Sequence, residues 1–131
     1  MKAIARLEAT PFTHRIDVRD HRLTVDEPAD KGGHDAGPSP QELLAASLAS
    51  CVAITIEMYA QRKDWELGTI EVECEYAAAD RGATTQFNLV LRLPSSCSDE
   101  EVERIRAIAA KCPVHGTLEG QVAFAERIER M

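Results

Sequence analysis

The 131 residues are enough for one folded domain with a hydrophobic core, and a composition of 44% hydrophobic and 28% charged residues is ordinary for a soluble globular protein. A formal net charge of −7 argues against nucleic acid or an anionic membrane surface as a partner. Because "MKAIARLEAT" contains no apolar signal-peptide core, we expect a cytoplasmic protein whose four cysteines are mostly thiols. We predict a single domain over residues 1–131.

The first 28 residues have the pattern of short strands. "KAIARLE" is a weak strand candidate, whereas "FTHRIDV" and "RLTVDE" flank a short polar segment, as the two arms of a hairpin do. The following segment, "PADKGGHDAGPSP", is rich in Gly, Pro and Asp and is predicted to be a loop.

A long helix is predicted from Ser39 to about Ala60. Ser39 and Glu42 have the spacing of a capping box, and Pro40 occupies the first helical position, where proline is well tolerated. Apolar and small residues occupy nearly every face, which is typical of a helix buried all round. We expect a sheet to cover one side and a second subunit the other. The stretch 43–60 is short for a membrane span and contains Glu57.

Two further strands alternate apolar and polar residues, as strands with one core face and one wet face do. The first lies in "GTIEVECEYAA" and the second in "TQFNLVLRLP". Their inward-facing residues are expected to be Ile70, Val72, Cys74, Tyr76, Phe87, Leu89, Leu91 and Leu93.

The last third of the chain predicts a helix and a final strand. Ser98 and Glu101 form a second capping box, and Pro113 is expected to end the helix. "QVAFAERIE" is predicted to be the last strand. The order β-β-β-α-β-β-α-β makes the fold class α+β. The apolar stripe of this helix comprises Val102, Ile105, Ile108, Ala109 and Cys112.

The four cysteines differ in their surroundings. Cys74 is expected to be a small core residue, and Cys97 lies in a loop beside acidic residues, which raise a thiol pKa. Cys51 and Cys112 lie on the buried sides of the two helices. If these helices pack together, the two thiols could approach closely enough to form a disulfide. From the spacing alone, two separate buried cysteines are the favoured interpretation.

Two motifs are informative together: "PSPQELLAASLASC" and "KCPVHGTL". With the residues between them, from about Gly32 to Leu118, the chain resembles the OsmC/Ohr family of thiol-dependent peroxide-detoxifying proteins. The resemblance implies an intertwined homodimer in which two long central helices lie between antiparallel sheets, with two sites at the subunit interface.

The resemblance also implies a chemistry. It makes Cys51 the reactive cysteine and Cys112 the resolving cysteine of a thiol peroxidase in oxidative or osmotic stress defence. Its expected substrates are organic hydroperoxides, with hydrogen peroxide as a second candidate. No bound cofactor is implied; an external dithiol, in some members a lipoyl-linked one, restores the thiols. Two alternatives remain: a thiol–disulfide redox protein that uses the same pair without peroxide, and a non-catalytic dimer that holds a small apolar ligand.

Family peroxidases also use an arginine from the N-terminal strands, held by a glutamate ten residues before the reactive cysteine. Here that position is Gln41, and Glu42 lies nine residues before Cys51, which is a rotation of about 100° on a helix. Glu42 therefore has a sufficient role in the capping box, and a site role is the second possibility. Arg15 is the preferred arginine among the candidates Arg6, Arg15, Arg19 and Arg22, and a surface arginine with no role in the site is an equally open interpretation of it.

A metal site is a weaker interpretation of the same residues. Cys51, Cys112 and His115 would supply three ligands, whereas structural zinc sites use four. We therefore expect no metal, and His115 to be either a proton donor or a surface residue.

Overall fold

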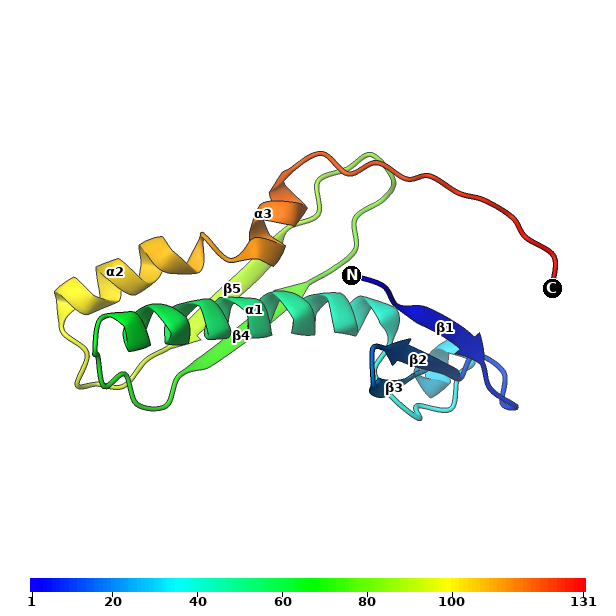
Figure 1. Cartoon of the computed structure of the whole chain (residues 1–131), viewed down its shortest axis with the longest axis horizontal. Helices are drawn as coiled ribbons and strands as arrows, with labels where there is room; N and C mark the ends of the chain where they lie inside the picture. The colour runs from blue at the N-terminus through cyan, green and yellow to red at the C-terminus, as the bar shows by residue number, and fades with distance from the viewer. The chain divides into compact units, whose positions relative to one another are not determined.

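The structure is a computed structural model that describes residues 1–131 (Figure 1). Its chain divides into two compact units, one formed by residues 1–46 and 78–85 and the other by residues 47–77 and 86–131. The mixture of helices and antiparallel sheets confirms the predicted α+β class. The single domain over residues 1–131 stays a prediction.

The first unit contains a three-stranded antiparallel sheet of order β1-β2-β3. The strands are β1 (Ile4–Leu7), β2 (His14–Val18) and β3 (His21–Val25), and a short 3-10 helix, η1 (Ala29–Lys31), follows them. β2 and β3 form the predicted hairpin, in which Val18 pairs with His21. Arg19 takes a left-handed conformation, with φ 53°, in the two-residue turn between them.

The loop after β3 is organised by one buried carboxylate. Asp26 is 1% exposed and accepts hydrogen bonds from the hydroxyl of Thr13 and from the backbone N–H groups of Glu27, His34 and Ala36, at 2.8–3.2 Å. The loop also closes tightly on itself: a Cβ added at Gly33 would lie 1.8 Å from the carbonyl oxygen of Glu27. This loop leads directly into the long helix.

Helix α1 (Pro40–Arg62) begins at the predicted capping box. Ser39 N–H donates to Glu42 Oε2 at 2.7 Å, and Glu42 N–H donates to Ser39 Oγ at 3.2 Å. One chain buries only one stripe of the helix, with members four residues apart. The cover that we expect from a second subunit on the other side stays a prediction. The buried residues are Leu48, Val52, Ile56 and Ala60.

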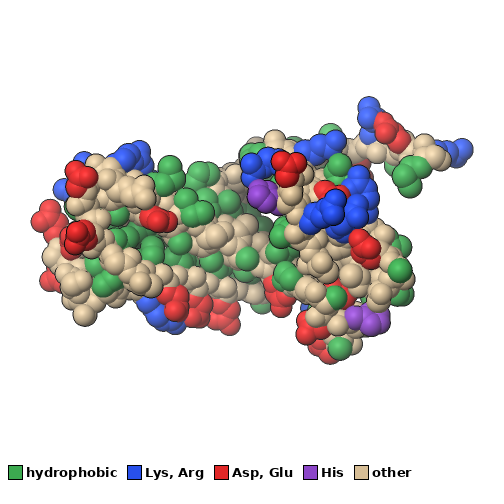
Figure 2. Space-filling model, turned by 60° about the horizontal axis from the view of Figure 1, so that its bottom comes forward, with side chains coloured by type: hydrophobic (Ala, Val, Ile, Leu, Met, Phe, Trp, Pro, Cys, Tyr) green, Lys and Arg blue, Asp and Glu red, His purple; other side chains and the backbone are tan.

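Elsewhere on α1 large apolar side chains are exposed: Ile54 is 54% and Met58 is 55% exposed. Figure 2 shows hydrophobic side chains in several places on the face that it presents. By length and composition α1 is also apolar enough to cross a membrane. This is weak evidence, because the core helices of soluble proteins meet the same criteria.

The second unit contains the antiparallel pair β4 (Glu71–Tyr76) and β5 (Phe87–Arg92). Burial alternates along both strands as predicted, with Val72, Cys74 and Tyr76 half-buried between exposed glutamates. On the wet face Arg92 pairs with Glu71 and Glu73, at 2.5 and 2.7 Å.

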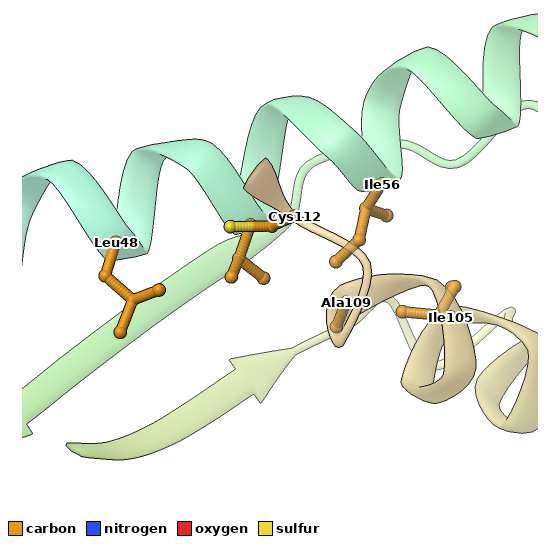
Figure 3. Close-up of a cluster of buried hydrophobic side chains, with 6 residues drawn as sticks. Leu48, Ile56, Ile105, Ala109 and Cys112 are labelled. Carbon is orange, nitrogen blue, oxygen red and sulfur yellow. The ribbon is translucent and has the colours of Figure 1, made fainter. Parts of the chain in front are cut away.

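Two helices follow, α2 (Asp99–Ala109) and α3 (Pro113–Glu119). The predicted capping box of Ser98 and Glu101 is present at the start of α2. Figure 1 shows α2 alongside α1, and Figure 3 shows the buried side chains between them. This core cluster comprises Leu48, Val52, Ile56, Ile105, Ala109 and Cys112.

Two sequence predictions about the end of the chain are wrong. The helix that was expected to reach Cys112 ends at Ala109, and the chain starts a new helix at Pro113, because proline cannot continue a helix but suits its first position. Residues 121–129 form no strand; they pair with no other strand of the chain, and Phe124 and Ile128 are 86% and 96% exposed.

Candidate functional site

Cys51 lies in the middle of α1, next to the buried stripe. It is half-buried and packs against the core cluster. Its backbone carbonyl accepts a hydrogen bond from the hydroxyl of Thr55, one turn later, at 2.7 Å. The helix therefore holds Cys51 at a fixed position, with its side chain at the edge of an apolar core.

Cys112 lies between α2 and α3 and is the N-cap of α3. Its Sγ accepts a hydrogen bond from the backbone N–H of His115 at 3.3 Å, as the side-chain oxygen of a serine cap would. Its side chain is 1% exposed, and Figure 3 shows it against α1, near Leu48 and Ile56. The cap and the core packing together fix the direction of the thiol.

The structure brings the two thiols together: Cys51 packs against the core cluster that contains Cys112, and its side chain is close enough to shift the pKa of Cys112. Both are free cysteines. Burial raises the pKa of Cys112, and the neighbouring Cys51 side chain raises it further. The backbone N–H groups of His115 and Val114 act in the opposite direction and lower it. The net shift is upward. Cys112 is therefore a protonated thiol at neutral pH.

The other two cysteines are in different positions. Cys74 lies on the inner face of β4, as predicted, and burial raises its pKa. Cys97 is in the loop before α2, with its backbone N–H bonded to the carbonyl oxygen of Pro94. The two thiols that lie together are thus the two cysteines that the family resemblance selected.

Arg15 is in β2, in the first unit. Its Nε is buried without a hydrogen bond and lies 3.3 Å from Asp17 Oδ1. Asp17 also pairs with Arg6, and with Arg22 at 3.8 Å. Arg15 therefore has a local electrostatic partner, and its role beside Cys51 stays a prediction.

Glu42 makes both hydrogen bonds of the capping box, which confirms the structural role that was preferred for it. Its carboxylate is engaged with the backbone N–H of Ser39, at the first turn of α1. A catalytic role of Glu42 remains the less favoured prediction.

His115 contributes to the site through its backbone. Its N–H bonds the Cys112 sulfur, whereas its ring Nδ1 is buried, lacks a hydrogen bond and lies 3.5 Å from Glu119 Oε1. No group of three or more His, Cys, Asp or Glu side chains in the chain could hold a metal ion.

Sequence reasoning missed the backbone donors at Cys112. A signal for them was present, because a residue followed by proline and then by a short helical stretch ending at Gly120 is the pattern of an N-cap with proline at the first helical position. Cysteine is uncommon at such a cap. The motif "KCPVHGTL" was therefore interpreted as a helix end rather than a helix start.

Comparisons with known proteins agree on one fold. Solved structures that resemble the chain include a protein from Psychrobacter arcticus 273-4 (TM-score 0.77, 19% identity, covering 89% of this chain and 87% of that one). An OsmC-like protein from Mycoplasma pneumoniae has a TM-score of 0.76 and 21% identity, covering 91% and 86%. The organic hydroperoxide resistance protein OsmC from Legionella pneumophila has a TM-score of 0.67 and 22% identity, covering 91% and 88%.

At these identities the structures show the fold alone. A search of curated proteins found no match. The sequence profile of the OsmC-like proteins, in contrast, matches residues 32–127, which is well over half of the chain and includes both members of the cysteine pair. The chain therefore belongs to the OsmC-like protein family.

Proposed function

We propose that this protein is a thiol-dependent peroxidase that reduces organic hydroperoxides through Cys51 and Cys112. The observation that carries the proposal is the closeness of these two thiols at the edge of the apolar core, where Cys51 packs against the cluster that contains Cys112. The OsmC/Ohr family includes peroxidase-like redox proteins, and one solved relative is named an organic hydroperoxide resistance protein, which supports the same chemistry.

In the proposed cycle Cys51 attacks first. Its thiolate attacks the terminal oxygen of the hydroperoxide; an S–O bond forms, the O–O bond breaks, the alkoxide leaves and takes up a proton to become the alcohol, and Cys51 becomes a sulfenic acid. The Cys112 thiol then attacks the sulfenic sulfur, water leaves, and a disulfide forms. The raised pKa of Cys112 suits this order, because a protonated thiol is a poor first nucleophile and is preserved for the second step.

An external dithiol completes the cycle. It reduces the disulfide by two successive thiol–disulfide exchanges and becomes oxidised itself. A lipoyl-linked dithiol is the reductant proposed from the family resemblance. The family consists of small soluble proteins, and we propose that this member works in the cytoplasm.

The decisive experiment mixes reduced protein in a stopped-flow instrument with cumene hydroperoxide and, separately, with hydrogen peroxide. The proposal expects two thiols to be lost per hydroperoxide consumed, within seconds, and the organic hydroperoxide to react faster. No consumption of either peroxide over hours would refute the proposal. In that case rapid reduction of the Cys51–Cys112 disulfide by dithiols would point to a thiol–disulfide redox protein, and slow reduction to a ligand-binding protein.

A further inference from the structure

A second feature of the unit that contains the cysteines is a basic pocket between α1 and the end of α2. It has a volume of about 470 Å³ and is lined by Thr55, Tyr59, Arg62, Lys63, Ile108 and Lys111. Half of these six residues are cations, in a chain that has 15 lysines and arginines against 22 aspartates and glutamates. We call this feature the basic pocket.

The three cations of the basic pocket have no acidic partners. None of the ion pairs in the chain involves Arg62, Lys63 or Lys111. No aspartate or glutamate is among the lining residues. Arg62 donates through Nε to the carbonyl oxygen of Met58, which leaves its terminal nitrogens available, and Lys63 Nζ lies 5.8 Å from the centroid of the Tyr59 ring. Three positive charges without an ion pair, at one concave surface, attract an anion.

The rest of the lining is suited to an organic group. The Tyr59 ring and the buried Ile108 provide apolar surface beside the cations. Tyr59 is held in position by an edge-on contact with Trp65, at a centroid distance of 5.5 Å. The volume lies in the range of small-molecule pockets, roughly 300–1,000 Å³, which is more than a bare ion needs.

The number of cations favours phosphate over a single carboxylate. A phosphate monoester carries up to two negative charges and three terminal oxygens, so it can accept from an arginine and two lysines at once. We propose that the basic pocket binds a small organic phosphate, whose phosphate contacts Arg62, Lys63 and Lys111 while its organic part lies against Tyr59 and Ile108. This site is independent of the proposed peroxidase activity.

Each cysteine of the pair is close in sequence to a residue that lines the basic pocket. Lys111 directly precedes Cys112, and the hydroxyl of Thr55 donates to the backbone carbonyl of Cys51. Bound ligand should therefore be visible in the backbone amides of residues 111–112 and of the middle of α1.

The test is titration of the ¹⁵N-labelled, reduced full chain with phenyl phosphate, followed by amide shifts and by calorimetry. We expect saturable shifts at residues 55–63 and 108–112. The double variant Arg62→Gln/Lys111→Gln should bind at least about tenfold more weakly. The matched control Arg81→Gln/Arg106→Gln removes two exposed positive charges that do not line the pocket, and should bind as the unmodified chain does.

Comparison ligands identify which part of the probe is recognised. Inorganic phosphate and benzyl alcohol should each bind more weakly than phenyl phosphate. Equal affinity for inorganic phosphate would overturn the organic component, and equal affinity for benzyl alcohol would overturn the role of the cations. Unchanged binding in the pocket variant, equal weakening in the control, or no saturable shifts at millimolar ligand would overturn the site itself. None of these results depends on whether the cysteines consume peroxide.

Discussion

At the scale of single residues, the two cysteines of the pair have different environments. Cys51 is part of a regular helix and half-buried, whereas Cys112 is almost fully buried and accepts a hydrogen bond from the backbone N–H of His115 at a helix start. The pKa of Cys112 is raised because burial and the Cys51 thiol outweigh the backbone N–H donors. This asymmetry supports different roles for the two thiols in the proposed cycle.

The roles can be separated with two alanine variants. Cys51→Ala should consume no hydroperoxide, even in a single turnover. Cys112→Ala should consume one equivalent and stop at a sulfenic acid, which a dimedone-type probe traps and which excess peroxide converts to sulfinic acid. Mass spectrometry after one equivalent of cumene hydroperoxide distinguishes them. A trapped sulfenic acid on Cys112 in the Cys51→Ala protein would reverse the assignment.

Glu42 provides a second prediction about a single residue. Glu42→Gln should lower the free energy of unfolding by about 1 kcal/mol or less, because glutamine keeps the capping geometry but loses a negative charge at the helix N-terminus. Glu101→Gln, at the equivalent position of the other capping box, is the matched control. Urea denaturation and peroxide consumption should show similar small losses of stability and unchanged activity in both. A large loss of activity in Glu42→Gln alone would indicate that Glu42 orders a catalytic cation.

At the scale of elements, local sequence signals predicted most of the fold. The hairpin of β2 and β3, the two capping boxes and the alternation in β4 and β5 are each determined by residues close in the chain. The juxtaposition of Cys51 and Cys112 could not be obtained this way, because it depends on how α2 packs on α1. Only the family resemblance favoured that pairing over two separate buried thiols.

The two errors have physical causes. The strand expected at residues 121–129 has a suitable apolar pattern, but a strand also needs a neighbouring strand to accept and donate its backbone hydrogen bonds, and sequence pattern contains no information about that neighbour. The helix boundary at Cys112 was missed because the proline was interpreted only as a stop signal. Its second property, compatibility with the first turn of a new helix, determined the result.

The loop between β3 and α1 predicts a pH dependence of stability. Burial acts to raise the pKa of Asp26, but hydrogen bonds from the N–H groups of Ala36 and Glu27, the Thr13 hydroxyl and the His34 N–H lower it overall. Since the folded pKa is below the unfolded value of about 3.9, the ionised carboxylate stabilises the fold fully above that pH, and the contribution is lost as the pH falls through the folded pKa.

Asp26→Asn tests this dependence. The variant should be less stable than the unmodified chain at pH 7, and the difference between them should narrow on acidification below about pH 4. Thermal unfolding followed by circular dichroism over this range measures both. Asp20→Asn, in the exposed turn between β2 and β3, should follow the unmodified chain. A constant difference at every pH would contradict the proposed role of the ionised carboxylate.

At the scale of the whole molecule, the exposed apolar residues of α1 support the proposal that two chains form a homodimer. A single chain leaves Ile54 and Met58 more than half exposed on a helix whose other stripe is fully buried. Exposed apolar surface of this kind is typical of protein interfaces. The family resemblance implies the same arrangement.

Analytical ultracentrifugation tests the dimer. At low micromolar concentration the chain should sediment at twice its mass of 14.4 kDa. Ile54→Glu/Met58→Glu should give a monomer or an unstable protein, since it places charges in the proposed interface. Ala107→Glu, on the exposed side of α2, is the control and should remain dimeric. A folded monomer of the unmodified chain would refute the proposal.

The cap at Cys112 offers a way to follow the oxidation state of its sulfur. The same sulfur that would be oxidised also accepts the hydrogen bond that starts α3, and a helix of seven residues has little stability of its own. Any reaction at that sulfur changes the acceptor available to the first turn. The amide proton of His115 therefore reports whether the Cys112 sulfur has reacted, because its rate of exchange with solvent depends on the hydrogen bond to that sulfur. Measuring this rate needs no added label or dye.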